Sequence, residues 1–177
     1  MATNLEFIKK VEVRNGANPE ITDIFSDKYD VYKIFITKVD LGTGFVNAFG
    51  NMRLINTSTG TPDTTANYDS AGKYMYANTN FGENRYTNQT QIINSFSYMN
   101  TGAENNWGEV TIFNPYNSGS YTFFTGQSSS MFYQIGSGSY CTAVKSIGCH
   151  TVEQSNSGLQ IVISDITTMD IKVFGVK

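Results

Sequence analysis

The sequence predicts an all-β protein, a jelly-roll-like antiparallel sandwich of about eight to ten strands. Three observations predict this fold. Short segments alternate apolar and polar side chains, turn residues separate them at regular spacing, and no window of eleven or more residues keeps the apolar spacing of an amphipathic helix. Neither an internal repeat nor a break in composition divides the chain, so one domain over residues 1–177 is expected.

The first predicted strand, residues 5–13, is the clearest. Its apolar side chains, such as Phe7 and Val11, alternate with charged ones, so one face is expected on a core and the other in water. Asn15 and Gly16 then form a turn signal. The chain is therefore expected to begin in a strand of the sandwich.

The second long strand is predicted at residues 29–39. Ile34 and Ile36 share one face, while Val31 and Phe35 lie on the other. Apolar side chains on both faces indicate a strand that is covered on both sides for part of its length. The link before it, residues 21–27, is predicted to be irregular.

Shorter strands are predicted in the rest of the chain, and one segment is assigned neither to a strand nor to a loop. Residues 64–86 contain the strand-like Tyr74 and Tyr76 in loop-like surroundings, and the serine run 128–130 is interpreted as a break between two strands. The further strands are predicted at residues 46–56, 89–99, 107–113, 120–127, 131–136, 141–148, 159–164 and 169–177.

Composition narrows the classes of partner. The net charge is -3 with a pI of about 5.1, and charged residues make up only 15% of the chain. Nucleic-acid binding needs clustered Lys and Arg, so no nucleic-acid partner is expected. No apolar run is long enough to span a membrane, and the start of the chain does not resemble a secretory signal. Synthesis in a cytosol is therefore expected.

The single histidine, His150, and two cysteines, Cys141 and Cys149, are the first candidates for chemistry. A tetrahedral zinc site needs more ligands, so no metal is predicted. Cys149 and His150 are neighbours on a strand and should point to opposite faces, whereas a pairing of Cys141 with His150 stays open. The cysteine spacing suits a hairpin and makes a disulfide sterically possible, although a reducing cytosol favours free thiols.

Acidic residues are the second candidates, because paired carboxylates can hydrolyse glycosidic bonds. Asp23, Asp27, Asp30 and Asp40 lie close together in the sequence, but Asp27 and Asp30 belong to a turn where carboxylates commonly bond backbone amides. No catalytic residue and no cofactor are predicted, and the chain is expected not to be an enzyme.

Sugar binding is the third possibility, since aromatic faces stack on sugar rings. Trp107 follows a polar stretch, and Tyr116 and Tyr121 flank a polar loop. These three residues are the candidate ligand-binding side chains. The competing interpretation is that each fills a core or an interface, and the residue pattern favours it.

Two motifs carry a resemblance to a known group of proteins. They are residues 21–36 and the terminal strand 170–177, supported by residues 51–56 and 107–115. The chain resembles small β-sandwich proteins from virion gene clusters of aquatic tailed phages, including cyanophages. The residues that match the group's two patterns are Phe25, Tyr29, Asp30, Tyr32, Lys33 and Ile34, and then Lys172, Val173, Gly175 and Lys177. Thr168 and Met169 depart from the glycine that the group usually has before its last strand.

The resemblance implies a non-enzymatic structural protein of the virion, made in the host cytoplasm. The first hypothesis is a capsid decoration (cement) protein, a homo-oligomer and expected trimer, that binds the major capsid protein and stabilises the head. The alternative is a tail-fibre or adhesin module that binds host surface glycan. The sequence does not separate a head location from a tail location.

Overall fold

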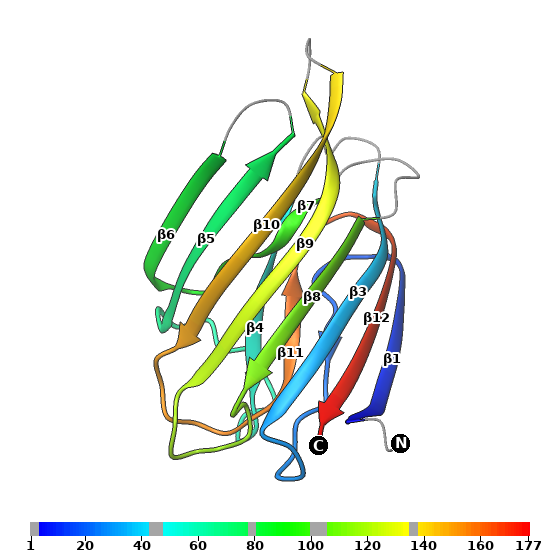
Figure 1. The fold of residues 1–177 in the computed structure, drawn as a ribbon. Helices are drawn as coiled ribbons and strands as arrows, with labels where there is room; N and C mark the ends of the chain where they lie inside the picture. The colour runs from blue at the N-terminus through cyan, green and yellow to red at the C-terminus, as the bar shows by residue number, and fades with distance from the viewer. Residues whose placement is uncertain (1–3, 43–47, 78–80, 100–105, 135–137) are drawn as a thin grey trace.

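The structure, a computed structural model, describes residues 4–42, 48–77, 81–99, 106–134 and 138–177. In this part of the chain there are twelve strands and no helix (Figure 1). The strands form two antiparallel sheets that face each other, so the predicted all-β sandwich is confirmed. The number of strands is larger than the eight to ten expected from the sequence, because β5, β6 and the short β2 were not predicted.

The larger sheet has eight strands and the smaller sheet has four. In sheet order, the larger sheet consists of β1 (Leu5–Gly16), β12 (Ile166–Val176), β3 (Val31–Leu41), β8 (Asn106–Phe113), β9 (Thr122–Gln134), β10 (Gly138–His150), β5 (Tyr68–Tyr76) and β6 (Phe81–Gln89). The smaller sheet consists of β2 (Glu20–Ile21), β11 (Asn156–Val162), β4 (Ala48–Asn56) and β7 (Ile92–Met99).

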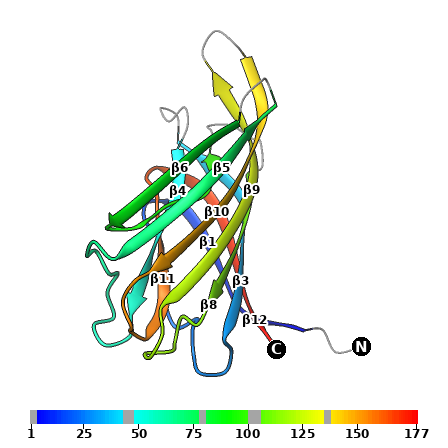
Figure 2. The same cartoon turned by 60° about the vertical axis from the view of Figure 1, so that its left-hand side comes forward.

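The connectivity is that of a jelly roll with two inserted hairpins. When β5–β6 and β9–β10 are set aside, eight strands remain, four in each sheet, and the chain changes sheet at every step except from β4 to β7. The two hairpins pair with each other through β10 and β5, which extends the larger sheet beyond β8. Figure 2 shows the long strands of this extension side by side. We call the four strands β9, β10, β5 and β6 the extension.

The core lies between the two sheets. Ile34 and Ile36 of β3 are fully buried there, together with Leu159 and Ile161 of β11, which face them from the smaller sheet. Burying one such side chain contributes about 1.5–3 kcal/mol to folding. The predicted inward face of residues 29–39 is thus confirmed, and the alternation of buried and half-buried residues in β3 follows from its period of two.

The opposite face of β3 differs from the expectation of cover on both sides. Phe35 is only half-buried, and its described aromatic contact is with Phe174 of the neighbouring β12, with ring centroids 5.7 Å apart. Its cover therefore comes from the same sheet, because the smaller sheet lies on the other side of β3 (Figure 1).

The serine run does not divide two strands. β9 continues through residues 128–130 and stays paired with β10 along this stretch. Ser128 and Ser130 are buried on the inner face, where Ser130 Oγ lies 3.3 Å from Thr142 Oγ1. Pairing with β10 satisfies the backbone, so small polar side chains are accepted within the strand.

Candidate functional site

The face of the larger sheet that points away from the smaller sheet is the main candidate for binding. We call it the outer face. Its exposed large apolar side chains include Phe7 (57% exposed), Ile147 (57%), Phe123 (48%) and Trp107 (43%). Val110, Phe124 and Val144 lie an odd number of positions from Trp107, Phe123 and Ile147 in the same strands. They are buried on the inner side, as expected from alternation along strands.

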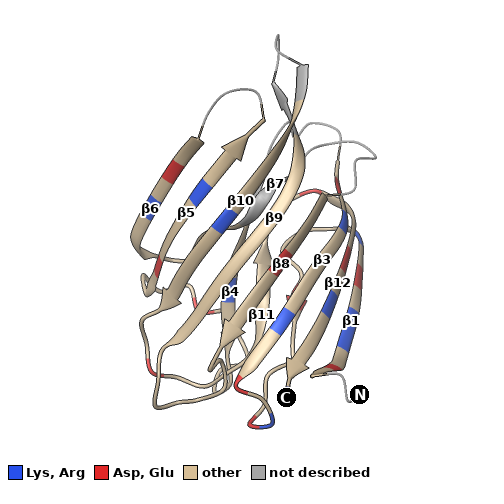
Figure 3. Cartoon of the chain, viewed as in Figure 1, with Lys and Arg blue, Asp and Glu red and all other residues tan. Residues whose placement is uncertain are grey.

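The outer face carries charges as well as apolar side chains. Figure 3 shows Lys, Arg, Asp and Glu positions scattered over the strands of the larger sheet, with wide uncharged stretches between them. Lys33 of β3 forms an ion pair with Glu109 of β8 at 2.5 Å, and Gln127 of β9 donates to the same carboxylate at 3.3 Å. The charges near the middle of the sheet are therefore partly neutralised among themselves.

Two adjoining hollows lie on the outer face of the extension. The first has a volume of about 590 Å³ and the second about 530 Å³, and both are lined by Ala71, Arg85 and Ile147. Ala71 of β5 lies opposite Ile147 of β10 and Arg85 of β6 in the strand register. Because the side chain of Ala71 is small, it leaves a depression in the surface between Ile147 and Arg85. Phe123 and Cys149 line the far side of the second hollow.

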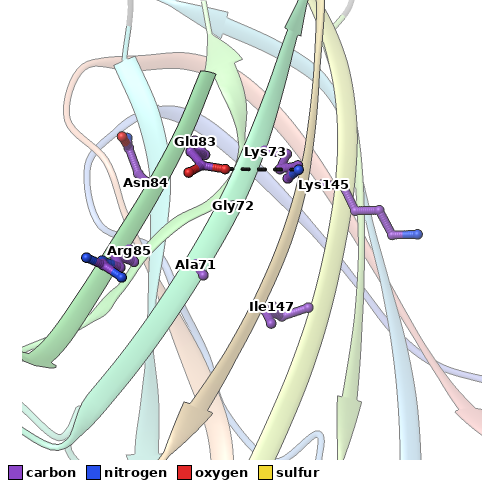
Figure 4. A pocket seen from close by; sticks show the side chains of 8 residues that line it. All are labelled: Ala71, Gly72, Lys73, Glu83, Asn84, Arg85, Lys145 and Ile147. Atoms are coloured by element: carbon purple, nitrogen blue, oxygen red, sulfur yellow. Dashed lines mark ion pairs between the residues drawn. The ribbon is translucent and has the colours of Figure 1, made fainter. Parts of the chain in front are cut away.

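The charged side chains of the first hollow do not converge on one point. Lys73 Nζ lies 4.0 Å from Glu83 Oε2, and both side chains are about four-fifths exposed. Exposed ion pairs of this kind contribute about 0–1 kcal/mol. Figure 4 shows Lys145 directed away from that pair, while Arg85 lies along β6. The hollow is thus a broad surface for contact rather than a tight ion site.

The structure separates the three predicted sugar-binding residues. Trp107 lies on the outer face near the start of β8, where it pairs with Ser129 of β9. Tyr121 is 43% exposed just before β9, eight residues from Ser129, so about 26 Å of strand separate it from Trp107. Tyr116 is partly buried and packs against the core. No single site of these three residues exists.

The cysteines lie on one strand rather than on the two arms of a hairpin. Cys141 and Cys149 both belong to β10, eight residues or about 26 Å apart, and both are free. An internal disulfide is therefore excluded, because a disulfide needs Cα atoms within about 7 Å. The possible pairing of Cys141 with His150 fails for the same reason.

His150 and Cys149 point to opposite faces, as predicted. Cys149 is half-buried on the outer face, where burial raises the pKa of its thiol, while His150 is fully buried on the inner side. Within the described residues, no group of three or more His, Cys, Asp and Glu side chains is placed to hold a metal ion. The described residues contain no helix with the length and apolar character needed to cross a membrane.

The surroundings of His150 were not predicted from the sequence. Its Nε2 lies 2.8 Å from Asp63 Oδ2, and its ring lies over Tyr68 with centroids 4.6 Å apart. Burial lowers the pKa of His150, against the opposing effect of Asp63. Burial raises the pKa of Asp63, but hydrogen bonds from Thr65 and His150 outweigh it and the pKa is lowered. The site is enclosed and structural.

The four aspartates that lie close in sequence do not form a carboxylate pair. Asp27 lies in the turn before β3, Asp40 lies near the end of β3, and Asp23 has a positive φ of 58° in the link that follows β2. The predicted turn position of Asp27 is confirmed. These residues are close in the sequence but do not lie at one site, because Asp40 is at the far end of β3 from the turn that holds Asp27.

Comparison with known proteins adds one distant structural likeness. No protein family and no curated protein matches the chain. Among solved structures, the marine PL-14 alginate lyase from Aplysia kurodai is similar over 95% of this chain and 81% of the lyase chain, with 8% identity and a TM-score of 0.35. A likeness this loose supports no conclusion about fold or activity.

Proposed function

We propose that this chain is a non-enzymatic structural protein of a tailed-phage virion, a capsid decoration protein that binds the major capsid protein through the outer face of its larger sheet. The observation that carries the proposal is the exposure of several large apolar side chains on that face. Ile147 and Phe123 stand beside the two hollows, and Trp107 stands further along the same face.

The extension explains how such a face arises. The other eight strands form the jelly-roll core, whereas β9, β10, β5 and β6 enlarge only the larger sheet. These four strands widen the larger sheet to eight strands, and so its outer face is wider than the four-stranded smaller sheet. Exposed apolar side chains that line a hollow together, as Ile147 and Phe123 do, are typical of protein–protein contact.

The binding mechanism follows from the area available. Ile147 and Phe123 are each about half exposed, so burying the remainder of each contributes about 1 kcal/mol. Single contacts of this strength are weak. Repeated around a closed homo-oligomer on a symmetric shell, they bind firmly through effective concentration.

The copy number and location in purified particles test this function directly. A decoration protein is expected at hundreds of copies per head in a particle reconstruction, with the outer face of β9 and β10 against the capsid protein. A few copies at the tail, or absence from the particle, would contradict the proposal.

Variants of the outer face test the contact itself. Ile147→Asp and Phe123→Asp are expected to weaken binding to particles that lack this chain by tenfold or more, measured by co-sedimentation. Ser164→Asp is a matched control, because Ser164 is exposed after β11 and lies outside the larger sheet. Unchanged binding of both outer-face variants would show that the contact lies elsewhere.

A glycan-binding adhesin module is the second candidate function. The observation that favours it is the 43% exposure of Trp107 on the outer face, where an indole is open to stack on a sugar ring. In this case a glycan array should show specific binding that Trp107→Ala removes and Trp107→Phe partly keeps. Binding that survives Trp107→Ala, or no binding at all, would speak against this function.

A further inference from the structure

Among the described residues, no strand pairs with the outer edge of β6. β6 is the last strand of the larger sheet and pairs only with β5 on its inner side. Its residues alternate between exposed and half-buried, with no buried residue along the strand. Backbone N–H and C=O groups on such an edge are a template for pairing with another strand.

The other sheet edges are less suited to pairing. β1 is interrupted by a bulge between Phe7 and Lys9 and carries Lys9 and Lys10, and lysines and bulges discourage edge contact. β2 has two residues, and the pairing of β7 with β4 shifts register twice. β6, in contrast, is in regular register with β5 from Phe81 to Tyr86. Among the described strands, β6 thus offers the most regular free edge.

Two opposite charges lie close together on this edge. Glu83 and Arg85 are two residues apart, and both side chains therefore point to the outer face. Glu83 makes only the long, exposed contact with Lys73, and within the described residues Arg85 has neither a hydrogen bond nor an ion pair. Arg85 can therefore take a partner, and Glu83 can replace its long contact with Lys73 by a closer one.

We infer that β6 pairs antiparallel with β6 of a second copy of this chain, about a twofold axis at Asn84. In that register Glu83 of each copy lies directly opposite Arg85 of the other. The contact is isologous, so the same pair forms twice, and the two larger sheets join into one. This dimer differs from the trimer expected from the sequence, and the inference does not rest on the proposed virion function.

The charges select this register over its neighbours. Residues directly opposite in an antiparallel pair point to the same face and interact, and like charges there are destabilising. An axis at Glu83 places the two Glu83 carboxylates opposite each other, and an axis at Arg85 does the same for the two guanidinium groups. Only the axis at Asn84 sets opposite charges together on both sides.

Sedimentation velocity of the full chain over a range of concentrations tests the inference, with charge reversal as the perturbation. The parent protein is expected to be in monomer–dimer equilibrium. Glu83→Arg alone and Arg85→Glu alone should each weaken the dimer by about tenfold or more, because like charges then face each other. Lys145→Glu is the matched control, since it reverses a charge on the same face away from the edge.

Restoration is the decisive measurement. A mixture of the Glu83→Arg and Arg85→Glu proteins should form heterodimers, and the double variant should dimerise with itself, because opposite charges meet again in both cases. Circular dichroism verifies that each variant is folded. Four results would each overturn the inference. The parent protein could be monomeric at all concentrations, or it could be trimeric. Its dimer could be unaffected by both charge reversals, or mixing the two variants could fail to restore dimerisation.

Discussion

His150 Nε2 and Asp63 Oδ2 lie 2.8 Å apart and join residues that are 87 positions apart in the sequence. His150 ends β10, and Asp63 lies in the segment between β4 and β5, so the contact ties together the bases of the two inserted hairpins. Asp63 is ionised because its pKa is lowered, and its carboxylate therefore accepts the hydrogen bond from the imidazole N–H. Tyr68 completes the arrangement by donating its hydroxyl to Asp63 O at 3.1 Å.

The first prediction is that stability falls as the pH drops below about 6.5. Burial lowers the pKa of His150 from 6.5. Its buried Nδ1 has no hydrogen-bond partner among the described residues, so the folded state disfavours the protonated ring. The unfolded chain then binds more protons than the folded chain, and the free energy of unfolding decreases as pH falls. Urea unfolding between pH 8 and 5.5 measures the slope. His150→Gln should flatten it, and an unchanged slope in that variant would contradict the assignment.

The second prediction concerns Gly148 of β10. A Cβ at this position would overlap the ring of Phe124, its partner on β9. Gly148→Ala should therefore destabilise the fold by about 1–3 kcal/mol through overpacking. Gly72→Ala on β5 is the control, because its nearest neighbour would be the Lys145 carbonyl oxygen at an ordinary 3.5 Å. Equal midpoints of urea unfolding for the two variants would refute the packing argument.

The third prediction concerns Asp170 of β12, which lies between two cations. Its side chain is 4% exposed and contacts Arg14 of β1 at 2.9 Å and Lys38 of β3 at 3.2 Å. Burial raises its pKa, but the hydrogen bonds from Arg14 and Lys38 prevail and lower it. Asp170→Asn should cost about 1–3 kcal/mol, because charge-assisted hydrogen bonds are lost at a buried position.

Chemical denaturation at pH 7 and at pH 3 measures the effect of Asp170→Asn. The difference between the variant and the parent should shrink at the lower pH, because stability from a lowered carboxyl pKa is lost as the pH falls through that pKa. Glu153→Gln is a suitable control, since Glu153 is exposed outside both sheets. A difference that stays constant with pH would mean that the carboxylate charge does not matter.

The fourth prediction concerns thiol reactivity. Cys141 is exposed, whereas Cys149 is half-buried and burial raises the pKa of its thiol. Because the thiolate is the reactive form, iodoacetamide should modify Cys141 several-fold faster than Cys149. Mass spectrometry of tryptic peptides measures the two rates. Equal rates would contradict the burial of Cys149, and an internal disulfide in the oxidised protein would contradict the placement of both residues on β10.

The sequence predicted two long strands that pack against the core and missed β6, which does not. Residues 5–13 and 29–39 were predicted because one side of each strand is buried, which imposes a period of two on the side chains. β6 was missed because neither of its faces is buried, so its side chains follow no such pattern. Its extended form depends on pairing with β5.

The candidate binding surface was predicted only in part. An exposed Trp107 was consistent with the polar stretch before it, but the same polar-loop argument applied to Tyr116, which packs against the core. Ile147 and Phe123 were not singled out, because an apolar residue in a strand gives no sign of which face it occupies. The register with Ala71 of β5, which creates the hollow, depends on strands far apart in the chain.

The sequence by itself determined that this chain is all-β, because alternation and turn spacing are local properties that each segment carries alone. Only the tertiary structure decided which strands are neighbours. Strand pairing placed Cys141 and Cys149 on one strand, brought Asp63 to His150, and left the edge of β6 open. These outcomes depend on contacts between distant segments, which are selected by the packing of the whole core and not by the residues on either side.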